Sequence, residues 1–178
     1  MKLIALGSNL VHPRFGQPRA TCEAALAALE TAEVRVVGRS RWYRSAPVPP
    51  SGQPWFVNGV VSVECELAPA DLLAILHRIE ADFGRERRTR NEARVLDLDL
   101  IAYDDRISSP EEVPVLPHPR MTERAFVLLP LADLAPDWRH PASGRPLADL
   151  IGALEPIQGI EVIPETAEGH DSSPMGGG

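Results

Sequence analysis

The segment from Ala93 to Asp105 reads ARVLDLDLIAYDD and alternates leucine with aspartate at its centre. Successive side chains of a β-strand point to opposite faces, so a strand here directs its leucines to one side and both Asp97 and Asp99 to the other. Parallel sheets are buried on both faces, whereas an antiparallel sheet can pack one face on helices and leave the other in water. The alternation therefore predicts a half-buried strand of an antiparallel sheet.

The composition indicates one globular domain. The chain has 178 residues, of which 44% are hydrophobic, and this is enough for a sizeable core. Its net charge of −7 argues against broad binding to nucleic acid or to anionic membranes. No apolar run approaches the roughly 20 residues of a membrane span, and the start MKLIALGSN is too short for a signal peptide. Cys22 and Cys65 are isolated within apolar patterns, as in reduced cytoplasmic proteins. We expect a cytoplasmic protein without a nucleic-acid or membrane partner.

The order of the expected elements predicts the fold class. Periodicity indicates strand, helix, strand, strand, helix and strand, in the ranges 2–6, 19–32, 33–46, 55–67, 68–84 and 93–105. This order predicts an α+β fold, a ferredoxin-like βαββαβ antiparallel sheet with helices on one face. A helical segment within 122–134, interrupted near Pro130, and a short helix within 145–154 would form a C-terminal helical appendix. We assign 1–163 to a single domain and 164–178 to a disordered tail.

Two local signals set boundaries within this plan. The dipeptide Asn58-Gly59 is the strongest short signal for a hairpin turn. A turn there would leave the three residues WFV as a stub, so we predict one continuous strand in which Asn58 shares a face with Phe56 and Val60. Gly84 follows a helical pattern and predicts its C-terminal end.

The aspartate pair is the first candidate for chemistry. Residues two apart in a strand lie about 6.6–7 Å apart at Cα, so the carboxylates of Asp97 and Asp99 project side by side. Two such carboxylates repel each other unless a cation lies between them. Mg²⁺ usually takes one or two protein carboxylates and completes its shell with water and phosphate. A solvated sheet face would show the same spacing.

Arginines gather directly before the aspartates, at Arg85, Arg87, Arg88, Arg90 and Arg94. A solvated surface loop can carry such a run. A cationic segment beside a carboxylate pair is, however, what a bound polyphosphate needs, because arginines neutralise phosphate oxygens and a metal bridges them. The adjacency favours the polyphosphate interpretation. The motifs of P-loop, dinucleotide-binding, zinc and serine-nucleophile sites do not occur in the sequence.

A family resemblance connects these pieces. Its segments, in chain order, are ALGSNL, RSRWYRSAP, FVNGVVSVE, HRIEADFGRER, ARVLDLDLIAYDD and LPHPRMTERAFVLLPLADLAPDW. Together, from about Leu3 to Leu154, they resemble the 6-hydroxymethyl-7,8-dihydropterin pyrophosphokinase family. The spacing R-x-x-D-[LIV]-D, followed by P-H and R-x-F, carries the resemblance best.

The resemblance implies a ferredoxin-like fold and an Mg²⁺-dependent pyrophosphokinase of folate biosynthesis. Such an enzyme transfers pyrophosphate from ATP, its co-substrate, to the hydroxymethyl group of 6-hydroxymethyl-7,8-dihydropterin and releases AMP. It would act as a monomer on these small-molecule substrates, with two Mg²⁺ ions.

The resemblance also implies residue roles. Catalytic roles fall to Arg85, Arg94, Asp97 and Asp99, with Asp97 and Asp99 holding the metal ions. ATP contacts fall to His77, Glu80, Arg87, Arg94, His118 and Arg124. Pterin contacts fall to Gly7, Ser45, Ala46, Val48, Phe56, Asn58 and Phe126. The chain departs from the usual family residues at Ala46, Phe56, His77, Asn91, Glu92 and Pro119.

Two other functions fit part of this pattern. Another Mg²⁺-dependent nucleotide enzyme, such as a nucleotidyltransferase or glycosyltransferase, could use the D-x-D pair, but it would have no use for Asn58 between Phe56 and Phe126. A non-enzymatic ferredoxin-like binding or regulatory module would bind no ATP–Mg²⁺ and would leave the arginine–aspartate adjacency unexplained.

Overall fold

An antiparallel sheet forms the centre of the molecule, seen in a computed structural model that describes residues 1–84, 95–155 and 159–165. In chain order the elements are β1 (Lys2–Ser8), α1 (Pro18–Thr31), β2 (Arg35–Arg39), β3 (Tyr43–Ser45), β4 (Phe56–Glu64), α2 (Pro69–Asp82), β5 (Asp97–Tyr103), the 3-10 turn η1 (Met121–Glu123), α3 (Ala125–Leu134), α4 (Leu147–Gly152) and β6 (Ile160–Val162). Within the described part of the chain, no helix has both the length and the apolarity to cross a bilayer.

The sheet has the ferredoxin-like order. The strands lie in the order β5-β1-β4-β3-β6, with β2 paired to β4 as well, and every pairing is antiparallel. β1 is central, because β4 lies on one side of it and β5 on the other. The predicted α+β, ferredoxin-like fold is therefore confirmed.

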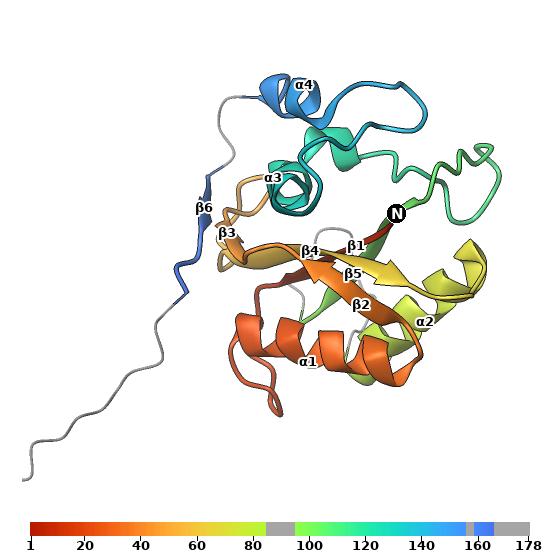
Figure 1. The fold of residues 1–178 in the computed structure, drawn as a ribbon. Helices are drawn as coiled ribbons and strands as arrows, with labels where there is room; N and C mark the ends of the chain where they lie inside the picture. The colour runs from red at the N-terminus through yellow and green to blue at the C-terminus, as the bar shows by residue number, and fades with distance from the viewer. Residues whose placement is uncertain (85–94, 156–158, 166–178) are drawn as a thin grey trace, which may run out of the picture.

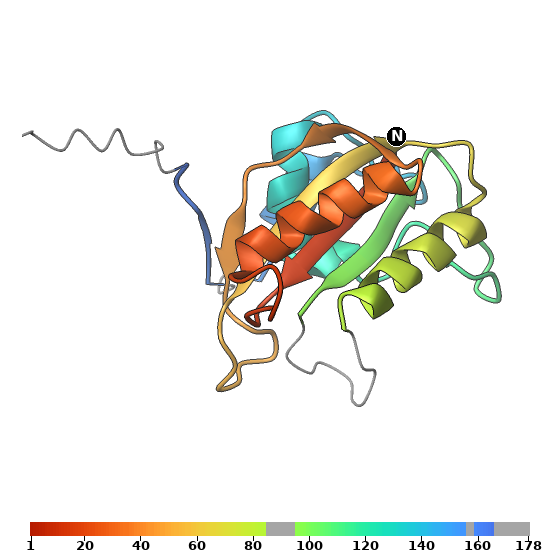
Figure 2. The same cartoon turned by 90° about the horizontal axis from the view of Figure 1, so that it is seen from below.

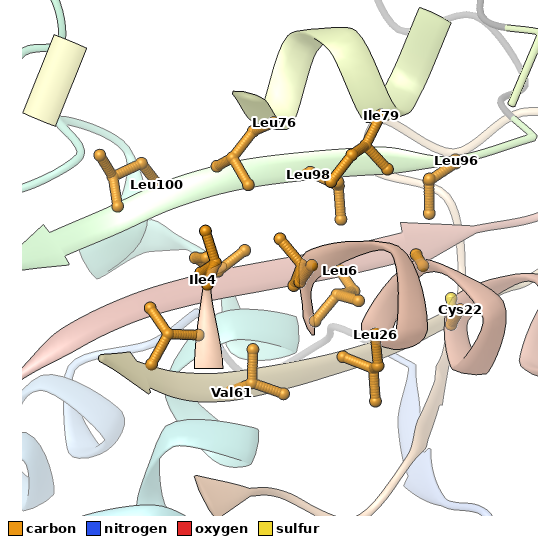
Figure 3. Close-up of a cluster of buried hydrophobic side chains, with 14 of the residues drawn as sticks. Ile4, Leu6, Cys22, Leu26, Val61, Leu76, Ile79, Leu96, Leu98 and Leu100 are labelled. Carbon is orange, nitrogen blue, oxygen red and sulfur yellow. The ribbon is translucent and has the colours of Figure 1, made fainter. Parts of the chain in front are cut away.

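One face of the sheet carries the main apolar core. Figures 1 and 2 show α1 and α2 side by side across this face. Three leucines point from the sheet towards α2: Leu98 and Leu100 of β5, and Leu96 just before it (Figure 3). They pack against Leu76 and Ile79 of α2. All of these side chains are almost fully buried, and burying each stabilises the fold by about 1.5–3 kcal/mol.

The opposite face is covered by α3, and α4 packs against α3 from the side away from the sheet (Figure 1). Leu3 and Ile101 of the sheet pack there against Val127, Leu128 and Leu131 of α3. The C-terminal appendix is thus a second helical layer, and it covers this face only in part. On β5 the aspartates near its start are half-buried, whereas Ile101 on the same face is fully buried.

The structure explains the Asn58-Gly59 signal. β4 continues through both residues, as predicted, from Phe56 to Glu64. A Cβ at Gly59 would lie 2.6 Å from Cζ3 of Trp42, so glycine is needed here to admit the indole ring and not to make a turn. The predicted helix stop is also confirmed, because Gly84 has φ +82 directly after α2.

Three sequence-based boundaries were wrong. The segment 33–46, expected as one strand, is divided into β2 and β3. α3 runs through Pro130 without interruption, although proline lacks the N–H that would bond the carbonyl of Phe126; burial of the helix in the second core outweighs this loss. β6 had no predicted counterpart, because a strand of three residues leaves too short a pattern to recognise.

Candidate active site

A pocket of about 310 Å³ opens where the second helical layer leaves the sheet uncovered. The first turn of α3 and the segment leading into it form one side, and the loop between β3 and β4 forms the other. Strands β1, β4 and β5 provide its floor. The lining residues are Ala5, Leu6, Gly7, Ser45, Ala46, Pro47, Val48, Pro49, Ser51, Gln53, Phe56, Asn58, Asp97, Asp99, His118, Arg120, Glu123, Arg124 and Phe126.

The pocket floor leaves space above the sheet because β1 contributes two small residues there, Ala5 and Gly7. Gly7 is in register with Asn58 on one neighbouring strand and with Asp97 on the other, so the three residues form one row. In the next row, Ala5 pairs with Asp99. A Cβ at Gly7 would lie 3.4 Å from Asn58 Oδ1 and 4.0 Å from Cβ of Asp97. Strand pairing therefore places an amide and two carboxylates along one shallow floor.

An oriented amide marks one end of the floor. Asn58 Nδ2 donates to Ser45 Oγ at 2.7 Å, and both side chains are about 96% buried, with 4% of each residue exposed. This bond uses one amide donor and so fixes the plane of the group, leaving Oδ1 beside Gly7 on the floor. Phe56 and Phe126 line the same pocket from β4 and α3. This end combines apolar rings with a fixed donor–acceptor group.

The other end of the floor is charged. Asp97 and Asp99 are half-buried and line the pocket. Arg124 Nη1 donates to Asp99 Oδ2 at 3.2 Å, and the guanidinium of Arg124 also lies 5.5 Å from the ring centroid of Phe126. Among the described residues, no group of three or more His, Cys, Asp or Glu side chains gathers as a metal cluster. Asp97 and Asp99 are thus the carboxylates that the described residues bring to this end of the pocket.

Glu80 of α2 bonds to β5 from the sheet face opposite the pocket. Its side chain is 1% exposed, and Oε1 accepts the backbone N–H of Leu98 at 2.7 Å. Leu98 lies between the two aspartates, so this bond ties α2 to β5 at the acidic residues. Sequence reasoning placed Glu80 at ATP and gave no sign of this role, which depends on how the helix packs.

His118 lies at the same end with a defined tautomer. Its backbone N–H donates to Ile101 O at 2.8 Å, and its Nδ1 accepts the backbone N–H of Arg120 at 3.1 Å. Burial, together with nearby Arg124 and Arg120, lowers the pKa of His118 below its usual value, although Asp99 acts in the opposite direction. The neutral ring therefore carries its proton on Nε2.

Most of the predicted site residues come together in this one pocket. Those that line it are Gly7, Ser45, Ala46, Val48, Phe56, Asn58, Asp97, Asp99, His118, Arg124 and Phe126. Glu80 and His77 lie on α2 and are not among its lining residues. Arg85, Arg87 and Arg94 lie outside the described residues, as do Asn91 and Glu92.

Sequence reasoning missed several residues of the pocket. Arg120 and Glu123 line its rim, and Pro47, Pro49, Ser51 and Gln53 line its loop side. Arg120 and Glu123 could have been predicted from the sequence, because both lie between two residues already assigned to the site, His118 and Phe126. The loop residues could not, since a proline-rich sequence does not indicate which way a loop folds.

The comparison with protein families agrees with this geometry. Residues 3–136 match the model of the 7,8-dihydro-6-hydroxymethylpterin-pyrophosphokinase (HPPK) family. The chain belongs to the HPPK family. A 2-amino-4-hydroxy-6-hydroxymethyldihydropteridine pyrophosphokinase of Pseudomonas aeruginosa is 46% identical over 162 residues, which are 90% of this chain and 95% of that protein. One of the same name from Methylorubrum extorquens is 40% identical over 161 residues, 90% of this chain and 96% of that protein.

Solved structures extend the HPPK likeness to the fold. The wild-type HPPK-DHPS of Plasmodium falciparum with STZ-DHP superposes with a TM-score of 0.63 over 85% of this chain. Sequence identity is 13%, and the chain spans 42% of the length of that protein. Because the identity is so low, this likeness bears on the fold alone.

Proposed function

We propose that this HPPK-family chain transfers pyrophosphate from ATP to the hydroxymethyl group of 6-hydroxymethyl-7,8-dihydropterin, giving AMP, as a step of folate biosynthesis. Its family and its named relatives are pyrophosphokinases of this substrate. The observation that carries the proposal is the row formed by Asn58, Gly7 and Asp97. Strand register alone sets a buried amide and a carboxylate at opposite ends of one floor, which suits a substrate with a flat heteroaromatic end and a phosphate-accepting end.

The amide end would bind the pterin. A pterin is a flat heteroaromatic ring system with a polar donor–acceptor edge, so it needs an aromatic face and a fixed amide. Phe56 and Phe126 supply aromatic surface, and Asn58, held by Ser45, supplies the amide. Gly7 leaves room for the ring above the floor. Ala46 and Val48 would complete the side wall from the loop.

The acidic end would bind the triphosphate with magnesium. Carboxylate oxygens are the ligands that Mg²⁺ prefers, and both partly buried carboxylates line the pocket, so the donor set fits. Asp97 and Asp99 would hold two Mg²⁺ ions. When bound, these would offset phosphate charge and align the reacting oxygens. Arg124 and the Nε2–H of His118 would contact phosphate oxygens directly.

The remaining ATP assignments stay predictions. Arg85, Arg87 and Arg94 would neutralise charge on the triphosphate, and they lie outside the described residues. Glu80 holds β5 through Leu98, and this is a supporting role beside any contact with nucleotide. His77 is exposed on α2.

The chemical step is an in-line displacement. The pterin hydroxyl oxygen bonds to the β-phosphorus of ATP, the bond from that phosphorus to the oxygen bridging to the α-phosphorus breaks, and AMP leaves with that oxygen. The hydroxyl proton passes to solvent or to a phosphate oxygen. The contribution of the chain is to hold the hydroxyl and the β-phosphorus in line and to place Arg124 near the developing charge.

The two other functions explain less of the pocket. A nucleotidyltransferase or glycosyltransferase would use the aspartates but not the buried Asn58–Ser45 pair beside Phe56. A binding module would use neither end. We also propose a cytoplasmic monomer without a nucleic-acid or membrane partner, with 1–163 as the single catalytic domain. The tail proposed for 164–178 lies, from 166 onward, outside the described residues.

One assay tests the activity. The chain is incubated with ATP, Mg²⁺ and 6-hydroxymethyl-7,8-dihydropterin, and the nucleotide products are separated. We expect AMP in equal amount to the pterin consumed, with none when the pterin is omitted. If ADP forms instead, the pyrophosphate transfer is wrong; if pterin is neither bound nor consumed, the substrate is wrong.

A further inference from the structure

Asp133, near the C-terminal end of α3, receives hydrogen bonds from four donor groups of two residues outside its helix. Arg41 Nη2 donates to its Oδ1 at 2.7 Å and Arg41 Nε to its Oδ2 at 3.1 Å. The hydroxyl of Tyr43 donates to Oδ2 at 3.0 Å, and the backbone N–H of Arg41 does so at 3.2 Å. One carboxylate therefore binds α3 to the chain entering β3.

This contact has a fixed geometry. A bidentate guanidinium–carboxylate pair restrains direction as well as distance. Tyr43 is 6% exposed; burial and then the bond to Asp133 raise the pKa of its phenol. Burial alone would raise the pKa of Asp133, but hydrogen bonds from Arg41 and Tyr43 outweigh it and hold that pKa below its usual value. The carboxylate is therefore charged at neutral pH and holds its donors in place.

The elements joined by Asp133 form the two sides of the pterin end. Phe126 lies in the first turn of α3. The same end of the helix is fixed by the bond from Arg124 to Asp99. Tyr43 is in register with Asn58, and it lies two residues from Ser45, the partner of Asn58. α3 lies over the sheet face (Figure 1), and its two ends are bonded to different strands, one through Arg124 to β5 and the other through Asp133 to Tyr43 of β3.

Apolar packing alone is a weaker directional restraint. Leu128 and Leu131 are fully buried against the sheet, and Leu134 packs against the same cluster. Such contacts hold α3 down, but each is less directional than a bidentate ion pair, so Asp133 adds a sharper restraint on the rotation of α3 and on its shift along the sheet. A displacement near 1 Å of a positioning group can cost about 100-fold in rate.

We propose that Asp133 is a positioning residue of this enzyme. It acts through Phe126 and Tyr43, by holding α3 at a fixed register over β3, and so sets the gap between Phe126 and the Asn58–Ser45 pair. The inference rests on the assignment of that gap to the pterin. It predicts that loss of Asp133 weakens pterin binding and leaves ATP binding nearly unchanged, because Arg124 still fixes the other end of α3.

The test compares four variants by steady-state kinetics with each substrate varied in turn. Asp133→Ala should raise KM for the dihydropterin about tenfold, and Tyr43→Phe about threefold, with KM for ATP changed less than about twofold. Asp133→Asn, which keeps the shape and can still accept from Tyr43, should fall between them. Glu64→Ala removes an exposed pair with Arg35 between β2 and β4 and should change neither KM.

Direct titration of the dihydropterin by calorimetry provides a readout without turnover. The same order of variants in Kd supports the inference even if no AMP forms, in which case the proposed reaction fails and the positioning role stands. If Asp133→Ala does not fold, Asp133→Asn and Tyr43→Phe decide. The inference is overturned if both KM values stay at the wild-type value or rise in parallel, since a purely structural contact would do either.

Discussion

The two faces of the sheet differ in polarity although they are formed by the same strands. The face covered by α1 and α2 is mainly apolar, and Leu98 and Leu100 are almost fully buried in it. The face covered by α3 is apolar around Ile101 and becomes polar towards Asp99 and Asp97. Adjacent residues of β5 thus face different surroundings, one the apolar core and the next the pocket.

The difference follows from how much of each face is covered. Two helices of fourteen residues lie across the first face, whereas α3 has ten and α4 six. The shorter layer leaves the end of the sheet open, and that open end is the pocket. We therefore expect substitutions on the first face to change stability and those on the open end to change activity.

The largest effect should come from the acidic end of the pocket. Asp97→Ala removes one of the two carboxylates proposed to hold Mg²⁺, so AMP formation should fall by about 1,000-fold or more. The thermal midpoint should stay within a few degrees of the wild type, because the side chain lines the pocket and belongs to neither apolar core. Asp105→Ala, at the exposed end of the same segment, is the matched control and should keep full activity. Near-normal turnover by the Asp97 variant would rule out the metal role.

The next largest effect is expected at Leu98, the residue between the two aspartates. Leu98→Ala leaves a cavity in the main core and should lower the free energy of unfolding by about 3 kcal/mol. Urea titration measures this loss, and kcat per folded molecule should change less than about threefold. Ile107→Ala, at a side chain that is 59% exposed, should cost less than about 0.5 kcal/mol. A strong loss of kcat without a loss of stability would break the division between the faces.

A smaller effect is expected on the pocket floor. Gly7→Val adds three carbons beside Asn58 Oδ1 without entering the core, so the fold should survive while KM for the dihydropterin rises about tenfold. Gly52→Val is the control, because a Cβ there meets nothing within 4 Å. Equal KM values for the two variants would mean that the pterin does not rest on this floor.

The smallest effect concerns the acid stability of the second layer. The pKa of Asp133 is lower in the folded chain than its unfolded value of about 3.9, so its contribution is present above that pH and is lost as pH falls through the folded pKa. The unfolding free energies of wild type and Asp133→Asn should therefore differ at pH 7 and converge at acidic pH, once the pH falls below the folded pKa. Urea titrations at both pH values measure this, and a constant difference would contradict it.

Much of the fold was readable from local patterns. The alternation around Asp97 and Asp99 showed which face of β5 would be wet, and the positions of Gly84 and Pro69 bounded α2. The path of α3 through Pro130 was not readable, because local propensity was overruled by burial. The pocket residues grouped on the proline-rich loop, such as Gln53, were not readable either.

The sequence by itself determined the longer strands, their faces and the chemical types at the site, because these depend on spacing along the chain. Only the tertiary structure decided which of these groups meet. Strand register set Gly7 between Asn58 and Asp97, helix packing brought Glu80 to the backbone of Leu98, and the C-terminal layer carried Asp133 to Tyr43. These are contacts between residues far apart in the chain, and their partners are chosen by how whole elements pack, which no local pattern records.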